Sequence, residues 1–162
     1  MWHRRIRSGR GIPRALNNVI ELNAFRKRTE ERRYVLFYLN SSGYFRNDVL
    51  ELTQGSVIEI QSPEALASAL LLYRPDSIIV EPSLSWADPY GLVSHLTQNH
   101  RAPIIMLFEP TPPERADENI RNAYCCGVSD TLFAPLCNQE LLTSLKILLG
   151  VTEDPFAFKR RL

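Results

Sequence analysis

The chain has 162 residues, of which 44% are hydrophobic and 23% charged, as in a globular protein with one sizeable core. It lacks a run of about eighteen apolar residues and an apolar signal-peptide segment, which argues against a membrane span and against secretion. Its three cysteines form neither an even disulfide framework nor a C-x-x-C pair, so we expect a cytoplasmic protein. The first twenty residues contain five arginines and no acid, so a mitochondrial presequence stays open as an alternative.

The net charge of +1 hides a marked asymmetry. Residues 1–33 contain ten Arg or Lys and three acids, a net charge of +7, whereas residues 34–162 contain nine and fifteen, a net charge of −6. The first eleven residues form a basic arm that carries Arg4, Arg5, Arg7 and Arg10. Such an arm can bind nucleic acid, an anionic surface or an acidic protein face, and it can also be a solvated tail.

Residues 13–33 have the pattern of an amphipathic helix that begins at Pro13, a residue favoured at the first helical position. Its apolar residues recur at steps of three and four, and they are Leu16, Val19, Ile20 and Ala24. This apolar stripe can dock on the rest of the chain or on a second copy, which would give a homodimer.

The remainder alternates between strand and helix patterns. Apolar runs predict buried strands at residues 34–39, 57–60, 77–80, 103–108 and 131–133. Helical patterns between and after them predict helices at 44–53, 65–73, 90–99, 114–126 and 139–149. Ser62 and Pro63 are a strong helix start, and Gly127 is a natural helix stop.

This alternation predicts an α/β fold, because parallel strands joined by right-handed helical crossovers form a sheet covered on both faces. We expect a flavodoxin-like, doubly wound five-stranded sheet of order 2-1-3-4-5 with an extra N-terminal helix. The expected organisation is a basic arm and helix at 1–33, a domain at 34–150 and a tail at 151–162. The carboxyl ends of the strands would place five residues around one crevice: Leu39, Asn40, Glu81, Phe108 and Ala134.

Several short motifs in residues 34–150 occur in a characteristic order. They are Arg74-Pro75-Asp76, Glu81 at a strand end, Gly91, Pro103-Ile104-Ile105-Met106-Leu107, Gly127-Val128-Ser129-Asp130 and Ala134-Pro135. With this order and spacing the chain resembles the receiver domain of bacterial two-component response regulators.

The resemblance also shows what is missing. Active receivers use an acidic pair to hold a divalent metal, an aspartate as phosphoacceptor, a Ser or Thr on the fourth strand and a lysine before the last proline. At these positions the chain has Leu39-Asn40 (or Asn40-Ser41, by register), Glu81, Phe108 and Ala134. The resemblance therefore implies a degenerate phosphoacceptor pocket made of Asn40, Glu81, Phe108 and Ala134, in a pseudo-receiver with no catalytic residue, metal or cofactor.

The connection after the fourth strand contains Pro110, Pro112 and Pro113, which stiffen the entrance to the next helix. In active receivers this face moves on phosphorylation and binds partners, so the resemblance makes it the candidate partner face here. Its predicted residues are Pro112, Arg115, Asn119, Asn122 and Leu136.

The sequence thus predicts a non-enzymatic regulatory module that binds another protein in signalling, transcription or assembly control. The alternative is an adaptor that binds nucleic acid or an anionic surface through its arm, and a third hypothesis is an active phosphoprotein that uses Glu81. For Cys125, Cys126 and Cys137 we expect buried structural thiols, because the histidines lack metal-ligand spacing relative to them.

Overall fold

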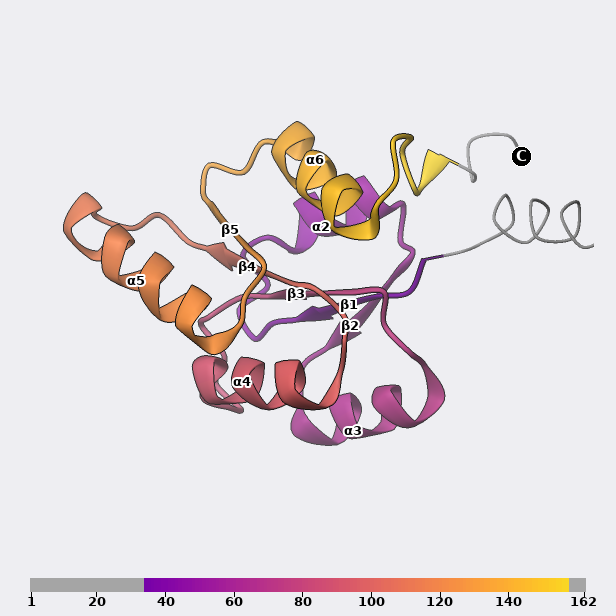
Figure 1. Ribbon diagram of the computed structural model, residues 1–162, viewed down its shortest axis with the longest axis horizontal. Coiled ribbons are helices and arrows are strands. Elements are labelled where there is room, and N and C mark those ends of the chain that lie inside the picture. The colour runs from indigo at the N-terminus through magenta and orange to yellow at the C-terminus, as the bar shows by residue number, and fades with distance from the viewer. Residues whose placement is uncertain (1–33, 158–162) are drawn as a thin grey trace, which may run out of the picture. The chain divides into compact units, whose positions relative to one another are not determined.

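Figure 1 shows a computed structural model, which describes residues 34–157; the basic arm and the predicted helix at 13–33 lie outside the described residues. The strands of the described part are β1 (Leu36–Leu39), β2 (Val57–Ile60), β3 (Ser77–Val80), β4 (Ile104–Phe108) and β5 (Asp130–Phe133). Its helices are α2 (Arg46–Thr53), α3 (Pro63–Leu72), α4 (Pro89–Asn99), α5 (Pro113–Cys126) and α6 (Asn138–Leu149).

All strand pairs are parallel, and the sheet order is β2-β1-β3-β4-β5. The flavodoxin-like topology predicted from the alternation of patterns is therefore confirmed. In the central register Leu39 pairs with Ile60 on one side and with Val80 on the other, so the strands end together at one edge. Because every crossover is a helix, all loops that follow the strands gather at this carboxyl edge.

The helix boundaries follow from local capping chemistry. The Ser62 hydroxyl accepts the N–H of Ala65 at 3.1 Å at the start of α3, and Asp88 caps α4 by accepting the N–H of Gly91 at 2.8 Å. Helix α5 ends at Gly127, whose φ is +102°. A Cβ at Gly127 would lie 2.8 Å from Cγ2 of Thr97, so only glycine fits this stop next to α4.

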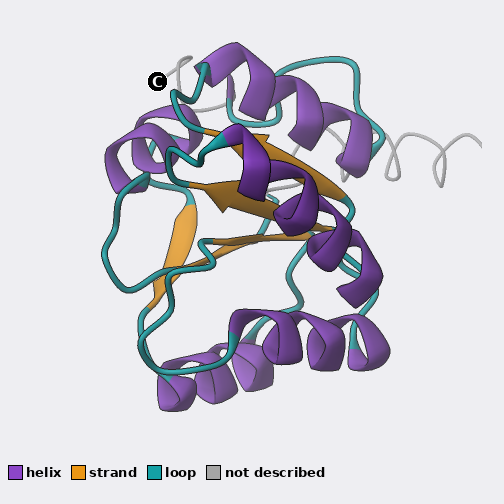
Figure 2. Ribbon diagram, turned by 90° about the vertical axis from the view of Figure 1, so that its left-hand side faces the viewer, coloured by secondary structure: helices purple, strands orange, loops and turns teal. Residues whose placement is uncertain are grey.

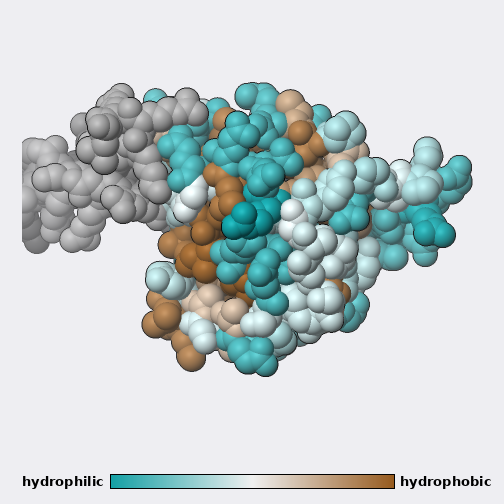
Figure 3. Space-filling model, turned by 180° about the vertical axis from the view of Figure 1, so that it is seen from behind, coloured by the Kyte–Doolittle hydropathy of each residue, from teal (hydrophilic) through white to brown (hydrophobic). Residues whose placement is uncertain are grey.

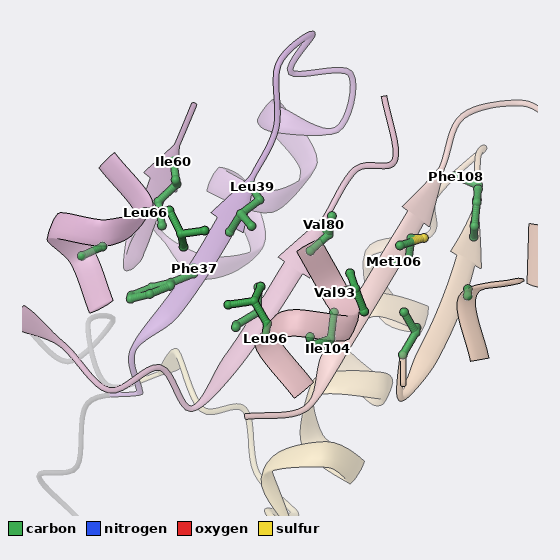
Figure 4. Close-up of a cluster of buried hydrophobic side chains, with 14 residues drawn as sticks. Phe37, Leu39, Ile60, Leu66, Val80, Val93, Leu96, Ile104, Met106 and Phe108 are labelled. Atoms are coloured by element: carbon green, nitrogen blue, oxygen red, sulfur yellow. The ribbon is translucent and has the colours of Figure 1, made fainter. Parts of the chain in front are cut away.

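Helices cover both faces of the sheet, as Figure 2 shows. Figure 4 shows the buried cluster on one face, where apolar side chains of the strands pack against α3, α4 and α5. The cluster on the other face joins the strands to α2 and α6. Phe156 belongs to this second cluster, so residues just beyond α6, in the predicted tail, pack on the domain.

The three central strands β1, β3 and β4 lie between helical layers, so their apolar runs are nearly continuous instead of alternating. Within residues 34–157 no helix is both long and apolar enough to cross a membrane.

Candidate functional site

Asn40 and Glu81 follow β1 and β3 directly and extend the parallel pairing past the ends of the strands. The N–H of Asn40 donates to the carbonyl of Ile60 at 3.1 Å, and the N–H of Glu81 donates to the carbonyl of Leu39 at 3.0 Å. Their backbones are thus neighbours at the carboxyl edge, as the sequence predicted.

The side chain of Glu81 is completely buried, with 0% exposure. Its Oε1 accepts the backbone N–H of Phe45 at 2.8 Å and also the hydroxyl of Tyr38. Phe45 is the residue immediately before α2. The carboxylate therefore fastens the start of α2 to the end of β3, and it explains why α2 begins at Arg46 instead of at the predicted Tyr44.

The other carboxylate oxygen of Glu81 lies near a group of polar side chains that the sequence analysis did not single out. The hydroxyl of Ser42 is 3.4 Å from Glu81 Oε2, 3.3 Å from Glu109 Oε1 and 3.5 Å from the hydroxyl of Ser83. One hydroxyl has a single proton, so Ser42 donates to one carboxylate at a time. Their positions in the sequence could have identified them, because these residues all lie within three residues of the end of β1, β3 or β4.

Tyr38 has a pKa raised well above its ordinary value near 10. Burial is the largest cause, and the hydrogen bond to Glu81 and the charge of Glu81 come next; the charge of Glu59 adds to them, while that of Arg46 acts in the opposite direction. The phenol therefore stays protonated and keeps its donor role toward Glu81.

Asn40 is also completely buried, but its side chain is directed toward β2. Its Nδ2 donates to Oε1 of Glu59 at 3.2 Å, and its Oδ1 accepts from Nε2 of Gln61 at 3.1 Å. Glu59 in turn forms an ion pair with Arg46 at 3.0 Å. Both polar groups of the Asn40 amide are thus occupied, one by Glu59 on β2 and the other by Gln61, which directly follows β2.

Phe108 and Ala134 close the other side of the predicted pocket. The ring of Phe108 stacks on Phe133, with 4.9 Å between ring centroids and 16° between planes. Ala134 donates its N–H to the carbonyl of Phe108 at 2.9 Å, but its methyl group packs with the second cluster. The structure brings the backbones of the four predicted pocket residues to one edge, whereas their side chains point in different directions and are buried or half-buried.

The residues at this edge do not fit the magnesium ion that the resemblance associates with an active receiver. A hard cation takes several oxygen ligands with free lone pairs. Leu39 offers no side-chain oxygen, the amide of Asn40 is occupied, and Oε1 of Glu81 already accepts two hydrogen bonds. Among residues 34–157 no group of three or more His, Cys, Asp or Glu side chains could hold a metal ion.

The predicted partner face is partly assembled around a hollow. Pro112, Arg115 and Asn119 line a hollow of about 420 Å³ together with residues from the ends of β3 and β4, among them Ser83 and Phe108. Asn122, also on α5, is exposed outside this lining, and Leu136 packs against the second cluster. The first turns of α5 are therefore the part of the predicted face that is concave.

The prediction of buried cysteines is wrong. Cys125 and Cys137 are exposed and Cys126 is half-buried. The helical pattern placed Cys125 and Cys126 at the end of α5, but a helix end lies at the surface and its last turn is only partly covered. Desolvation, followed by the charges of Cys125 and Asp88, raises the pKa of the Cys126 thiol above its usual value.

The fold is that of a receiver domain. No family model matches the chain, nor does any curated protein. A signal receiver domain of a two-component response regulator from Bacteroides fragilis matches with a TM-score of 0.62 at 18% identity, over 75% of this chain and 100% of that chain. A two-component response regulator from Clostridium difficile matches with a TM-score of 0.63 at 19% identity, over 72% and 96%.

A further similar structure is the receiver domain of a sensor histidine kinase from Pseudomonas aeruginosa, with a TM-score of 0.60 and 17% identity over 74% of this chain and 99% of that chain. That domain has a magnesium ion coordinated in its active-site cleft. The chain therefore shares the receiver fold, as its motifs predicted, while its residues at the corresponding edge make the network described above.

We expect Glu81→Ala to lower the free energy of unfolding by about 2–5 kcal/mol, because it leaves the buried N–H of Phe45 and hydroxyl of Tyr38 without an acceptor. Glu81→Gln keeps one oxygen for both donors and should cost less. Urea denaturation of the two variants and the wild type measures the difference. Equal stability of Glu81→Ala and the wild type would show that the network does not fasten α2.

The raised pKa of Tyr38 predicts that the free energy of unfolding depends on pH. Because its pKa is raised in the folded state, the folded chain keeps a proton that the unfolded chain releases above about pH 10, so this contribution to stability is complete below that pH and is lost above it. The stability curves of wild type and Tyr38→Phe should therefore converge as the pH rises above about 10. Denaturant titrations at increasing pH test this, and a constant gap between the curves would contradict it.

Proposed function

We propose that this chain is a pseudo-receiver, a regulatory module that binds another protein and acts without aspartyl or glutamyl phosphorylation. The observation that carries the proposal is the buried state of Glu81, whose carboxylate accepts hydrogen bonds from Tyr38 and Phe45. A phosphoacceptor must present an oxygen to an incoming phosphorus atom, and this carboxylate is engaged inside the domain.

The groups around Glu81 also favour a non-enzymatic role. Phosphoryl transfer needs positive charge or hydrogen-bond donors where negative charge develops. The corresponding positions hold Phe108, stacked on Phe133, and Ala134, neither of which has a side-chain donor. Glu109 adds a second carboxylate near Ser42, which disfavours a further anion at this edge.

We propose that the partner binds the face formed by Pro112, Arg115, Asn119, Asn122 and Leu136. Three of these residues border the hollow at the first turns of α5, and the side chain of Arg115 is exposed and makes no hydrogen bond or ion pair within residues 34–157. An exposed arginine beside Tyr90 and Phe108 in a concave surface has the composition of an interface anchor. The predicted helix at 13–33 would add docking or dimerisation.

A second candidate function is suggested by the net charge of +7 in residues 1–33. Through Arg4, Arg5, Arg7 and Arg10 the arm would hold nucleic acid or another anionic surface. Contacts of this kind supply affinity without sequence selectivity, so this role would accompany protein binding instead of replacing it.

Charge reversal at two arginines of α5, one on the proposed partner face and one outside it, tests this proposal. Arg115→Glu should reduce recovery of the main co-purifying protein from the native cell, because it puts a repelling charge on the proposed face. Arg121→Glu makes the same change at another exposed position of α5, about 240° further around the helix, and should leave recovery unchanged. Affinity purification with quantitative mass spectrometry measures both, and equal recovery with the two variants would contradict the proposed face.

A further inference from the structure

A second hollow, which we call the edge hollow, lies at the end of the strands opposite to Glu81, where β3 and β4 begin. It has a volume of about 570 Å³ and is formed where α3 and α4 end and where the chain enters β3 and β4. Apolar lining comes from residues such as Leu70, Pro75 and Pro103, and polar lining from Arg74, His100 and Arg101. None of these residues takes part in the network of Glu81 or in the face on α5.

An apolar surface continues from the rim of this hollow. Leu71 is 88% exposed, Leu72 is 75% exposed and Tyr73, which also lines the hollow, is 47% exposed. Figure 3 shows this apolar surface at the lower left, where α3 ends. Consecutive exposed side chains of this size are unusual on a soluble domain and mark an interaction surface.

The two arginines at the hollow are available for a partner. Arg74 and Arg101 are both exposed, and neither has a hydrogen bond or an ion pair with another residue of 34–157. Asp76 also lines the hollow, but its Oδ2 accepts the N–H of Val35 at 2.8 Å. The two arginines thus line the same hollow as Tyr73, which directly follows the exposed Leu71 and Leu72 in the chain.

The charge of the domain restricts what can bind there. Residues 34–157 contain six Arg or Lys and fifteen Asp or Glu, so most of the surface repels acidic ligands. Two of these six basic residues border this one hollow, and a third, Arg46, is paired with Glu59. The lining of this hollow has two arginines and one acid, whereas the hollow on α5 has one arginine and one acid, so an acidic ligand is favoured here. The broad plane of an anionic membrane would also face the acidic remainder of the domain.

We propose that this edge hollow binds an acidic amphipathic segment of a partner protein. Bulky apolar side chains of the segment would cover Leu71, Leu72 and Tyr73, and carboxylates beside them would pair with Arg74 and Arg101. This surface is separate from the proposed face on α5, so either one can be correct without the other.

The test is a selection from a phage-displayed dodecapeptide library on the full chain, with counter-selection on the double variant Arg74→Glu/Arg101→Glu. We expect the enriched peptides to combine Asp or Glu with Leu, Phe or Trp. Fluorescence anisotropy of the enriched peptides should then show an affinity roughly tenfold or more weaker for the double variant, and also weaker for Leu72→Ser.

The matched control is Arg121→Glu/Lys146→Glu, which makes the same charge change at two basic residues outside both proposed surfaces and keeps residues 1–33 intact. It should bind the peptides like the wild type, and circular dichroism checks that all variants are folded. The proposal is overturned by the absence of enriched peptides, by peptides without acidic residues, or by equal binding to both double variants. It is also overturned if vesicles containing phosphatidylserine, and not peptides, depend on Arg74 and Arg101 for binding.

Discussion

The arrangement of the carboxyl edge depends on one buried carboxylate. Glu81 ends the third strand and has no contact with solvent, so its oxygens need donors from the protein itself. The hydroxyl of Tyr38 on β1 and the N–H of Phe45, directly before α2, provide them. Glu81 thus ties the end of β3 to β1 and to the start of α2.

This constraint explains why neither proposed binding surface is centred on Glu81. The crevice is filled from within: Asn40 is held by β2 and its extension, Phe108 is stacked on Phe133, and Ser42 lies between two carboxylates. Accessible hollows of residues 34–157 include the one at the start of α5 and the edge hollow where α3 and α4 end. These hollows lie at opposite ends of the strands, so the two proposals together would let the domain contact two partners, or two parts of one partner, at the same time.

Much of the fold could be predicted from the sequence because periodicity and capping are local. The five apolar runs, the Ser62-Pro63 start and the Gly127 stop give the strands and helices to within two or three residues of where they lie, and topology follows from right-handed crossovers. The pattern also predicted which residues follow the strands. It could not predict side-chain direction, because whether Glu81 faces solvent or Tyr38 depends on contacts between residues 43 positions apart.

Other features also could not be predicted from the sequence, because they depend on contacts between residues far apart in the chain. Ser42, Ser83 and Glu109 lie in three loops that only the folded sheet brings together. Leu71 and Leu72 are exposed although leucine is usually buried. Helix α3 is apolar on most of its sides, and the sheet covers only one of those sides. Residues of this kind, which break a local rule, are where interaction surfaces are expected.

The central claim is that Glu81 is a structural group and does not accept phosphate. It is tested most directly by incubating the full chain with acetyl phosphate and Mg²⁺, beside a receiver domain with an intact phosphoacceptor aspartate, followed by intact-protein mass spectrometry. The account predicts that the control domain gains one phosphoryl group and that this chain gains none. A phosphoryl adduct on this chain that disappears in Glu81→Gln would contradict it.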